Sequence, residues 1–270
     1  YRDHARGGAE RRKARHPHQE LTARRMDIRV TLSANAGVSV ELGGVRIWID
    51  ALHDTRVPGF STLDSHLLQR LWSEAAFQSP DAIVYTHCHP DHYAAHLTAE
   101  ACRRWPKARL FLPQKDFPEQ ELLSGREAAA SIEGVALHFY RLTHDGMAFA
   151  GVPHYGLTIT CGRDSILLPG DCAVVSPELL PVVNGRHLRL ALLNFPWATL
   201  QRGRDFLREQ LHADQIALYH LPFEEDDTEG FRAAADRAAQ SLSGVGAVHV
   251  LDNRFQTLFI PDETQPAPHS

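Results

Sequence analysis

The segment Thr86-His87-Cys88-His89-Pro90-Asp91-His92 carries the densest group of chemically versatile residues in this chain. Three histidines and one aspartate fall between positions 87 and 92, directly after the apolar run 82–85. Imidazoles are poor core filler and gain little on an exposed turn, so packing does not account for this density. Imidazole nitrogen and carboxylate oxygen are donors that zinc accepts in proteins. The segment therefore predicts a metal site at the carboxyl end of a buried strand.

The spacing within this segment suits two metal ions. Side chains at i and i+2 of extended backbone point the same way, so His87 and His89 can share one ion. Pro90 lacks an N–H and favours a turn. We expect a helix to begin near Asp91, with His92 in its first turn, so that this second pair aims at an ion roughly 3.5–4 Å from the first. The alternative is a histidine-rich surface loop in which Asp91 only caps the helix.

Three further candidate ligands follow other strand-like runs. His144 comes after the run 137–142, Asp171 after 166–170 and His220 after 216–219. His154 is an alternative to His144. It too is next to a strand, since it precedes the run 155–161, and it lies nearer Asp171 in the chain. We favour His144, because a glycine-containing turn follows it. A site with these donors and an open position for water indicates hydrolytic chemistry.

The elements that must position these residues are mostly strands. Apolar and alternating runs predict strands at 28–32, 37–42, 45–51, 82–85, 109–112, 135–142, 155–161, 165–168, 215–221, 247–251 and 255–260. Helical spacing predicts helices after a Ser61 N-cap and over 91–105, 202–212 and 231–242. Residues 114–133 are interpreted as a polar, partly helical connection. Two β-rich halves, each followed by helices, predict a two-sheet sandwich covered by helices on both sides.

Composition places the chain among ordinary globular proteins with one domain. The 270 residues suffice for one large core. We expect residues 1–25 to be a disordered basic extension, 26–262 the folded domain and 263–270 a disordered tail. Met26 directly precedes the first strand-like run, and we expect the native chain to start there. No apolar stretch approaches the roughly 20 residues of a membrane span, and no secretory signal is evident.

Charge and cysteine usage narrow the partners and the compartment. Residues 1–25 carry a net charge of +5 and the remainder −10, so nucleic-acid binding is disfavoured and a small-molecule substrate is expected. The four cysteines show no C-x-x-C pairing, which suits free thiols in the cytoplasm. Nothing in the sequence indicates a particular oligomeric state.

The order of these motifs resembles that of the metallo-β-lactamase-fold metallo-hydrolases, over about residues 26–260. His87, His89, Asp91 and His92 match the H-x-H-x-D-H motif of that superfamily. Asp50 matches its early aspartate, which supports the metal loop without binding metal. His144, Asp171 and His220 match its later motifs. Thr143-His144-Asp145-Gly146 and the segment 219–227 resemble a little-characterised bacterial branch.

The resemblance implies an α/β fold, an αββα four-layer sandwich with two mixed sheets flanked by helices. It also implies two metal ions, most naturally zinc, with iron or manganese as alternatives. His87, His89 and His144 would hold the first ion, and Asp91, His92 and His220 the second. Asp171 would bridge them, and a bridging hydroxide would be the nucleophile. Asp91 would in addition orient that hydroxide or shuttle a proton, so Asp91 and Asp171 are the expected catalytic residues.

Three functions follow as hypotheses. The leading one is a dinuclear zinc hydrolase that cleaves an ester, phosphodiester, thioester or related bond. A second is a non-catalytic metal-binding or regulatory protein that keeps the fold; the intact set of ligands argues against it. A third is a lactonase or ester-hydrolysing detoxifying enzyme, which an apolar pocket near Phe195 and Trp197 would favour.

Overall fold

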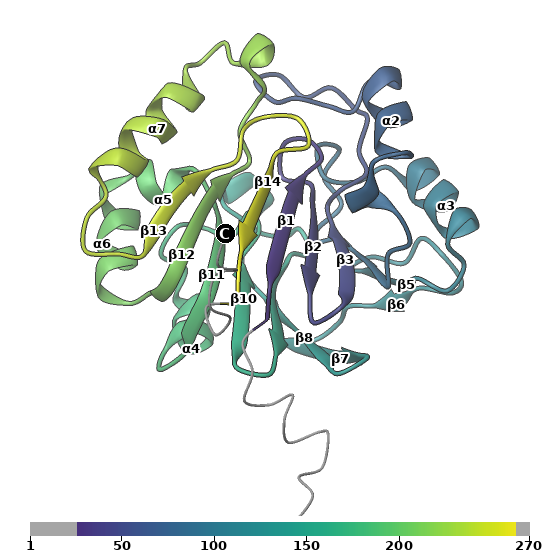
Figure 1. Cartoon of the computed structure of the whole chain (residues 1–270), viewed down its shortest axis with the longest axis horizontal. Coiled ribbons are helices and arrows are strands. Elements are labelled where there is room, and N and C mark those ends of the chain that lie inside the picture. The colour runs from purple at the N-terminus through teal and green to yellow at the C-terminus, as the bar shows by residue number, and fades with distance from the viewer. Residues whose placement is uncertain (1–25, 263–270) are drawn as a thin grey trace, which may run out of the picture.

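Two mixed β-sheets form the centre of the molecule (Figure 1). The structure is a computed structural model that describes residues 26–262. The first sheet has the order β14-β1-β2-β3-β4-β5-β6. Its strands are β1 (Ile28–Leu32), β2 (Val38–Leu42), β3 (Val45–Ile49), β4 (Ala82–Val84), β5 (Arg109–Leu112), β6 (Glu121–Leu122) and β14 (Thr257–Ile260).

The second sheet has the order β13-β12-β11-β10-β9-β8-β7. Its strands are β7 (Glu127–Ile132), β8 (Val135–Arg141), β9 (Tyr155–Cys161), β10 (Asp164–Leu168), β11 (His187–Asn194), β12 (His212–Tyr219) and β13 (Ala247–Val250). Both sheets contain antiparallel and parallel neighbours. The predictions for residues 1–25 and 263–270 lie outside the described residues.

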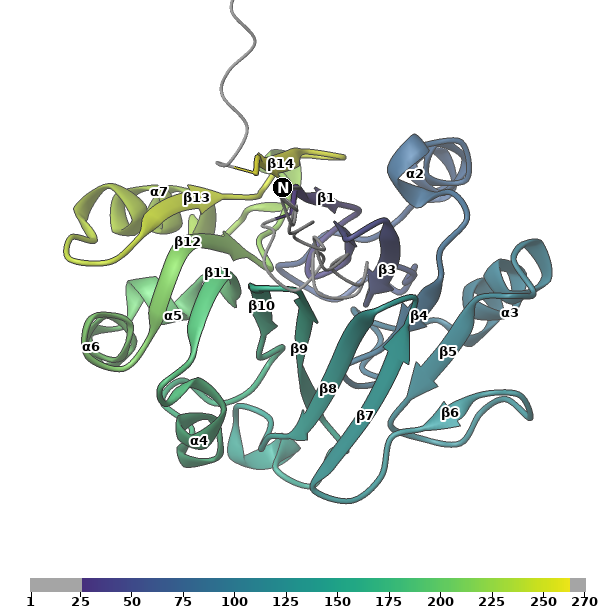
Figure 2. The same ribbon diagram turned by 60° about the horizontal axis from the view of Figure 1, so that its bottom comes forward.

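Helices cover the outer side of each sheet (Figure 2). The first sheet carries α2 (Ser65–Leu71) and α3 (Ala95–Arg104), and the second carries α4 (Leu180–Val183), α5 (Pro196–Thr199), α6 (Gln201–Glu209) and α7 (Phe231–Ser241). One apolar cluster fills the space between the sheets and under α2 and α3, and another lies under α4 to α7. The predicted αββα sandwich is therefore confirmed. Among the helices of residues 26–262, none is long and apolar enough to cross a bilayer.

Parallel strands bring the predicted site residues to one edge of the sandwich. β3 and β4 run parallel in the first sheet, and β10, β11 and β12 run parallel in the second. Because the carboxyl ends of parallel strands lie at the same edge, the residues that follow these strands converge there. Asp50 follows β3, Asp171 follows β10 and His220 follows β12. The topology thus assembles a site from segments far apart in the sequence.

Two predicted helix starts are wrong, and hydrogen bonds explain both. α2 begins after Asp64, whose carboxylate accepts from the Leu67 N–H, because the Ser61 hydroxyl is instead bound to Asp226 and to the Phe223 N–H. α3 begins only at Ala95. Residues 91–94 form a turn, in which the N–H groups of His92 and the next residue both donate to the His89 carbonyl.

Residues 114–133 form no helix, contrary to the prediction. They include β6 and β7, and the Gln120 side chain closes a loop by accepting from the N–H groups of Asp116 and Phe117. The strand β11, whose residues Leu188–Leu193 are all buried, was not predicted from the sequence either. A strand buried on both faces has no alternation to reveal it. This strand matters because it ends at Asn194, beside the site.

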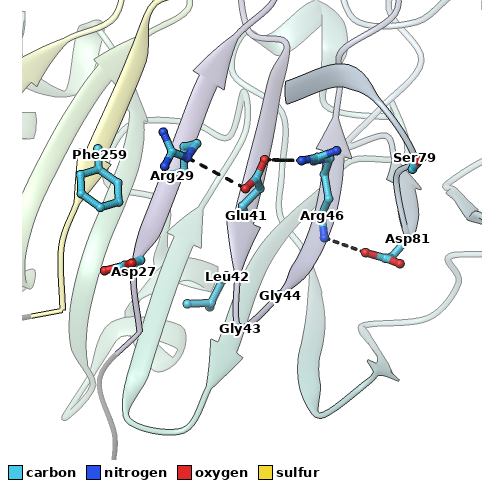
Figure 3. Close-up of a pocket in the computed structure, with 10 residues that line it drawn as sticks. All are labelled: Asp27, Arg29, Glu41, Leu42, Gly43, Gly44, Arg46, Ser79, Asp81 and Phe259. Atoms are coloured by element: carbon cyan, nitrogen blue, oxygen red, sulfur yellow. Dashed lines mark hydrogen bonds and ion pairs between the residues drawn. The ribbon is translucent and has the colours of Figure 1, made fainter. Parts of the chain in front are cut away.

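A hollow on the outer face of the first sheet lies away from these strand ends (Figure 3). Cross-strand pairing places Glu41 opposite both Arg29 and Arg46, and its carboxylate lies 4.0 and 2.7 Å from their guanidinium groups. Asp81 accepts from the Arg46 backbone N–H. Opposite charges paired across neighbouring strands stabilise a sheet modestly. We interpret this hollow as a solvated, charge-paired surface.

Candidate metal centre

The loop after β4 places its three histidines around one point at the strand ends. The rings of His87 and His89 lie 4.6 Å apart, and those of His87 and His92 lie 4.1 Å apart. Both His87 and His92 are completely buried, whereas His89 is half-buried. The turn at residues 90–94 folds the chain back, so His92 faces the same centre as the two preceding histidines.

Asp171 lies at the centre of the histidine cluster. Its Oδ2 is 3.2 Å from His92 Nε2 and 3.4 Å from His220 Nε2. The same oxygen lies 3.9 Å from His87 Nε2 and 3.8 Å from His144 Nε2. One carboxylate oxygen therefore faces four imidazole nitrogens that come from three parts of the chain. A residue in that position can bridge two cations.

The donor atoms separate into groups that could each hold a cation. One group contains His87, His89 and His144, and another contains Asp91, His92 and His220. Asp91 Oδ2 lies 3.7 Å from His92 Nε2 and 3.8 Å from His220 Nε2. The seven residues expected from the sequence to bind metal, Asp171 included, thus lie together. Asp50 also groups with His87 and His92, but its carboxylate is occupied by hydrogen bonds.

Asp50 controls the orientation of two of these histidines. Its Oδ2 accepts a hydrogen bond from the Thr86 hydroxyl at 2.6 Å and lies 3.0 Å from His92 Nδ1. The Thr86 hydroxyl gives its only proton to Asp50, so it accepts from His87 Nδ1, 2.9 Å away. Both imidazoles therefore carry a proton on Nδ1, and the Nε2 of His87 presents a lone pair to the centre.

We predict that Thr86→Val weakens metal binding without removing a ligand. The substitution keeps the shape of the side chain but removes the hydroxyl that links Asp50 to His87 Nδ1. Loss of such an outer partner costs about 10–100-fold in metal affinity or activity. Competition with a chromogenic chelator measures the affinity.

Thr98→Val is the matched control for this test. Thr98 is equally buried, but its hydroxyl bonds Tyr85 and the Ala94 carbonyl rather than a candidate ligand. It should lower thermal stability and leave metal affinity unchanged. Equal losses of affinity in the two variants would contradict the proposed link from Asp50 to His87.

His144 and His154 both lie near the centre, and their hydrogen bonds differ. His144 Nδ1 donates to the Asp145 carbonyl at 2.6 Å, and its Nε2 is buried with no hydrogen-bond partner. His154 Nε2 accepts from the Asp171 N–H at 3.0 Å, so Nδ1 donates to the Leu142 carbonyl. His154 therefore has no nitrogen left for a metal, and the geometry favours His144 as the third donor.

Separate replacement of these two histidines tests that assignment. His144→Ala should reduce the bound metal by about one equivalent, because it removes a free lone pair. His154→Ala should retain both metal equivalents but lower the melting temperature, since it leaves the buried Asp171 N–H without a partner. Elemental analysis and thermal unfolding distinguish the two outcomes. Metal loss confined to His154→Ala would reverse the assignment.

The ionisation of the cluster reflects burial and mutual charge. Burial, and then the neighbouring His92, hold the pKa of His87 well below its usual value. Burial followed by His144 lowers the pKa of His89 as well. Burial alone would also lower the pKa of His92, but Asp171 and Asp50 raise it well above normal. Burial opposes ionisation of Asp171, yet His92 and His220 hold its pKa well below normal. Neutral His87 and ionised Asp171 are the forms that bind metal.

Two asparagines that hold the acidic candidate ligands were not predicted from the sequence. Asn194, at the end of β11, donates to Asp171 Oδ1 at 2.8 Å and leaves Oδ2 facing the histidines. The Asn35 Nδ2 lies 3.4 Å from the backbone carbonyl oxygen of Asp91 and 3.4 Å from its Oδ2. Asn194 comes directly after the mostly apolar run 188–193, much as Asp171 and His220 come after theirs. The same sequence signal could therefore have identified it. Asn35 has no comparable sequence signal.

Three other polar features have contacts of their own outside the groups of candidate donors. His53 is buried, with Nε2 3.3 Å from the Ala34 carbonyl, and burial lowers its pKa to about 4. His96 forms an exposed ion pair with Asp54. In the acidic run 224–227, Asp227 accepts from the first N–H groups of α7, as a carboxylate at a helix N-terminus does.

No family sequence model and no curated protein matches this chain. Among solved structures, Igni18, a novel metallo hydrolase from the archaeon Ignicoccus hospitalis KIN4/I, is 20% identical with a TM-score of 0.60, over 87% of this chain and 98% of that one.

Two further solved structures are similar. The metallo-β-lactamase fold protein YhfI from Bacillus subtilis is 14% identical with a TM-score of 0.58, over 87% of this chain and all (100%) of that one. CmlA, a diiron β-hydroxylase from Streptomyces venezuelae, is 13% identical with a TM-score of 0.56, over 88% of this chain and 54% of that one. These similarities show that the chain has the metallo-β-lactamase fold, as the resemblance implied.

Proposed function

We propose that this protein is a metal-dependent hydrolase with a dinuclear, zinc-loaded centre at the carboxyl ends of β4, β10 and β12. The observation that carries the proposal is the set of buried, unpartnered Nε2 atoms of His87 and His144 around the Asp171 carboxylate. A buried polar atom without a partner is costly, so a cluster of free lone pairs is best explained by a cation that they bind.

The chemistry of the donors fits the proposed metal ions. His87, His89 and His144 would hold one ion, Asp91, His92 and His220 the other, and Asp171 both. Nitrogen-rich sites of this kind suit zinc, and imidazole with carboxylate also accepts iron or manganese. When bound, the ions would polarise the scissile group and lower the pKa of a water molecule.

The residues of the chain contribute orientation and proton control. Asp50 and Thr86 fix the tautomers of His87 and His92, and Asn194 fixes the side chain of Asp171. Asp91 is half-buried, with Oδ2 near His92 and His220. That position allows it to accept a proton from the attacking water and return it to the leaving group.

The experiment pairs metal content with turnover. Protein stripped with EDTA and reloaded with zinc should bind about two equivalents and hydrolyse at least one of a panel of esters, thioesters, phosphodiesters and amides. Reloading with iron or manganese in parallel identifies the most active metal. The second candidate, a non-catalytic metal-binding protein, is favoured if two equivalents bind and the whole panel stays intact.

The location and partners of the protein are part of the proposal. All four cysteines are free thiols, and two of them are buried. This state suits the reducing cytoplasm. A small molecule is the proposed substrate, because a cavity of about 340 Å³ adjoins the metal centre.

A further inference from the structure

The cavity beside the metal centre has one polar wall and one aromatic wall. His144, Asp171 and His220 line the first. The second is built by Phe60, Phe149, Phe195, Trp197 and Phe231. Its size, about 340 Å³, is at the lower end of the range for small-molecule sites. Whatever binds here presents one side to the candidate metal ligands and the other to aromatic rings.

Two phenylalanines contact different groups of candidate donors. The Phe60 ring meets His220 edge to face at 4.8 Å, and the Phe149 ring lies 5.0 Å from His89 and 5.3 Å from His144. Phe60 therefore covers a donor of one proposed ion, and Phe149 covers donors of the other. A substrate held at the centre would therefore have aromatic surface beside both groups of donors.

Deeper rings continue this aromatic wall. The rings of Phe195 and Phe231 lie 4.9 Å apart with their planes tilted by 33°, and Trp197 is buried against Phe206. Phe195 and Trp197 belong to the start of α5, which directly follows β11 and Asn194. The end of β11 therefore supplies Asn194, which orients Asp171. It also leads directly into Phe195 and Trp197, which line the pocket.

The charge of the pocket excludes a polyanionic substrate. Among the described residues that line it, none is lysine or arginine, and Asp145 adds a carboxylate at the rim. Metal ions can neutralise the group being cleaved, but nothing there compensates a second negative charge on the substrate. Removal of an unpaired charge from water is costly. An uncharged substrate with an apolar substituent fits these walls.

We infer that the substrate is an uncharged carboxylic ester, open or cyclic, whose alkyl or aryl group packs against the aromatic wall formed by Phe60, Phe149, Phe195, Trp197 and Phe231. This inference rests on the proposed hydrolase function. In the reaction, the oxygen of water bonds to the carbonyl carbon and the carbon–oxygen bond to the alcohol breaks. The proton from water goes to the departing alkoxide. An open ester gives a carboxylic acid and an alcohol, and a cyclic ester gives a single hydroxy acid.

The first test is hydrolysis of 4-nitrophenyl esters from acetate to hexanoate, beside bis(4-nitrophenyl) phosphate, by the zinc-loaded protein. We expect kcat/KM to rise by up to about fourfold for each added methylene, and phosphodiester turnover to be far slower. EDTA should abolish ester turnover. Phosphodiester cleavage without ester cleavage would overturn the ester assignment and leave the hydrolase proposal intact. Ester turnover that survives EDTA would instead contradict the proposed metal dependence.

A pair of matched variants locates the binding surface. Phe149→Ala should flatten the dependence on acyl length and lower kcat/KM for the hexanoate by about tenfold. Phe259→Ala is the control, since Phe149 and Phe259 are both 46% exposed but Phe259 lies on β14, in the hollow of Figure 3. Equal behaviour of the two variants would contradict the assigned surface.

Binding to metal-free protein separates the ester assignment from the proposed hydrolase activity. The ligand is 4-nitrobenzyl pentyl ketone, in which a methylene replaces the ester oxygen of the hexanoate, and the readout is calorimetry. Native protein and Phe259→Ala should bind it, and Phe149→Ala should bind it more weakly. Ketone binding without turnover of any substrate by the loaded protein would overturn the hydrolase proposal and support the pocket assignment. Absence of binding would overturn the pocket assignment itself.

Discussion

His87→Ala should reduce bound metal from about two equivalents to one or fewer, and should abolish turnover. His87 is completely buried, its Nδ1 is held by Thr86, and its Nε2 has no hydrogen-bond partner. The substitution removes one of only three nitrogen donors in the group that contains His89 and His144. We expect activity to fall by more than the roughly 10²–10³-fold that loss of a single transition-state donor costs. Elemental analysis and turnover of the best ester measure the two effects.

His249→Ala is the control for this substitution. His249 is partly buried and pairs with Gln215, away from the candidate ligands. It should keep full metal content and activity. Circular dichroism checks that both variants are folded. Unchanged metal content in folded His87→Ala protein would refute the assignment of the whole first group, because only His89 and His144 would then remain in it.

The site could be predicted largely because its residues follow strands. His87, Asp171 and His220 each come directly or nearly directly after a buried strand, and a strand's end is visible in sequence as the end of an apolar run. The i, i+2 spacing of His87 and His89 is likewise a local property. Local patterns therefore identified the donors, and the parallel pairing of the strands brought them together.

The interactions that support the ligands were much less predictable. The link from Asp50 through Thr86 to His87 depends on β3 and β4 being neighbours, which sheet topology alone decides. Asn35 reaches Asp91 across 56 positions of sequence. The aromatic wall combines Phe60, Phe149 and Phe195 from three separate loops. From the sequence, an apolar pocket near Phe195 and Trp197 was named only as a feature that would favour an ester-hydrolysing function.

The misplaced helix starts have the same origin. Ser61 is a good N-cap by residue type, but its hydroxyl bonds Asp226 and the Phe223 N–H, which ties the loop that carries Phe60 to the segment that follows His220. A tertiary contact thus overrode a local preference. Similarly, the turn after His89 delays α3 until Ala95 so that His92 faces the centre. Both departures from local helix preference occur where the chain positions residues of the candidate site.

Asp171→Asn should weaken both proposed metal positions at once. The substitution keeps size and shape, and Asn194 still faces the side chain, but the negative charge that Oδ2 presents to four imidazole nitrogens is lost. An amide also directs an NH2 group or a weaker oxygen donor at the cations. We therefore expect total metal content below one equivalent after dialysis. Activity should fall by more than the roughly 10–100-fold that loss of an outer partner costs.

Asp145→Asn separates this local role from a general effect of charge. Asp145 lines the same cavity and undergoes the same chemical change, but its side chain is exposed and only its backbone carbonyl contacts His144. That variant should keep about two metal equivalents, and it should tolerate anionic esters slightly better because a repelling carboxylate is gone. If Asp171→Asn lost only one equivalent, Asp171 would belong to a single ion. The centre would then consist of two independent sites whose occupancy could be titrated separately.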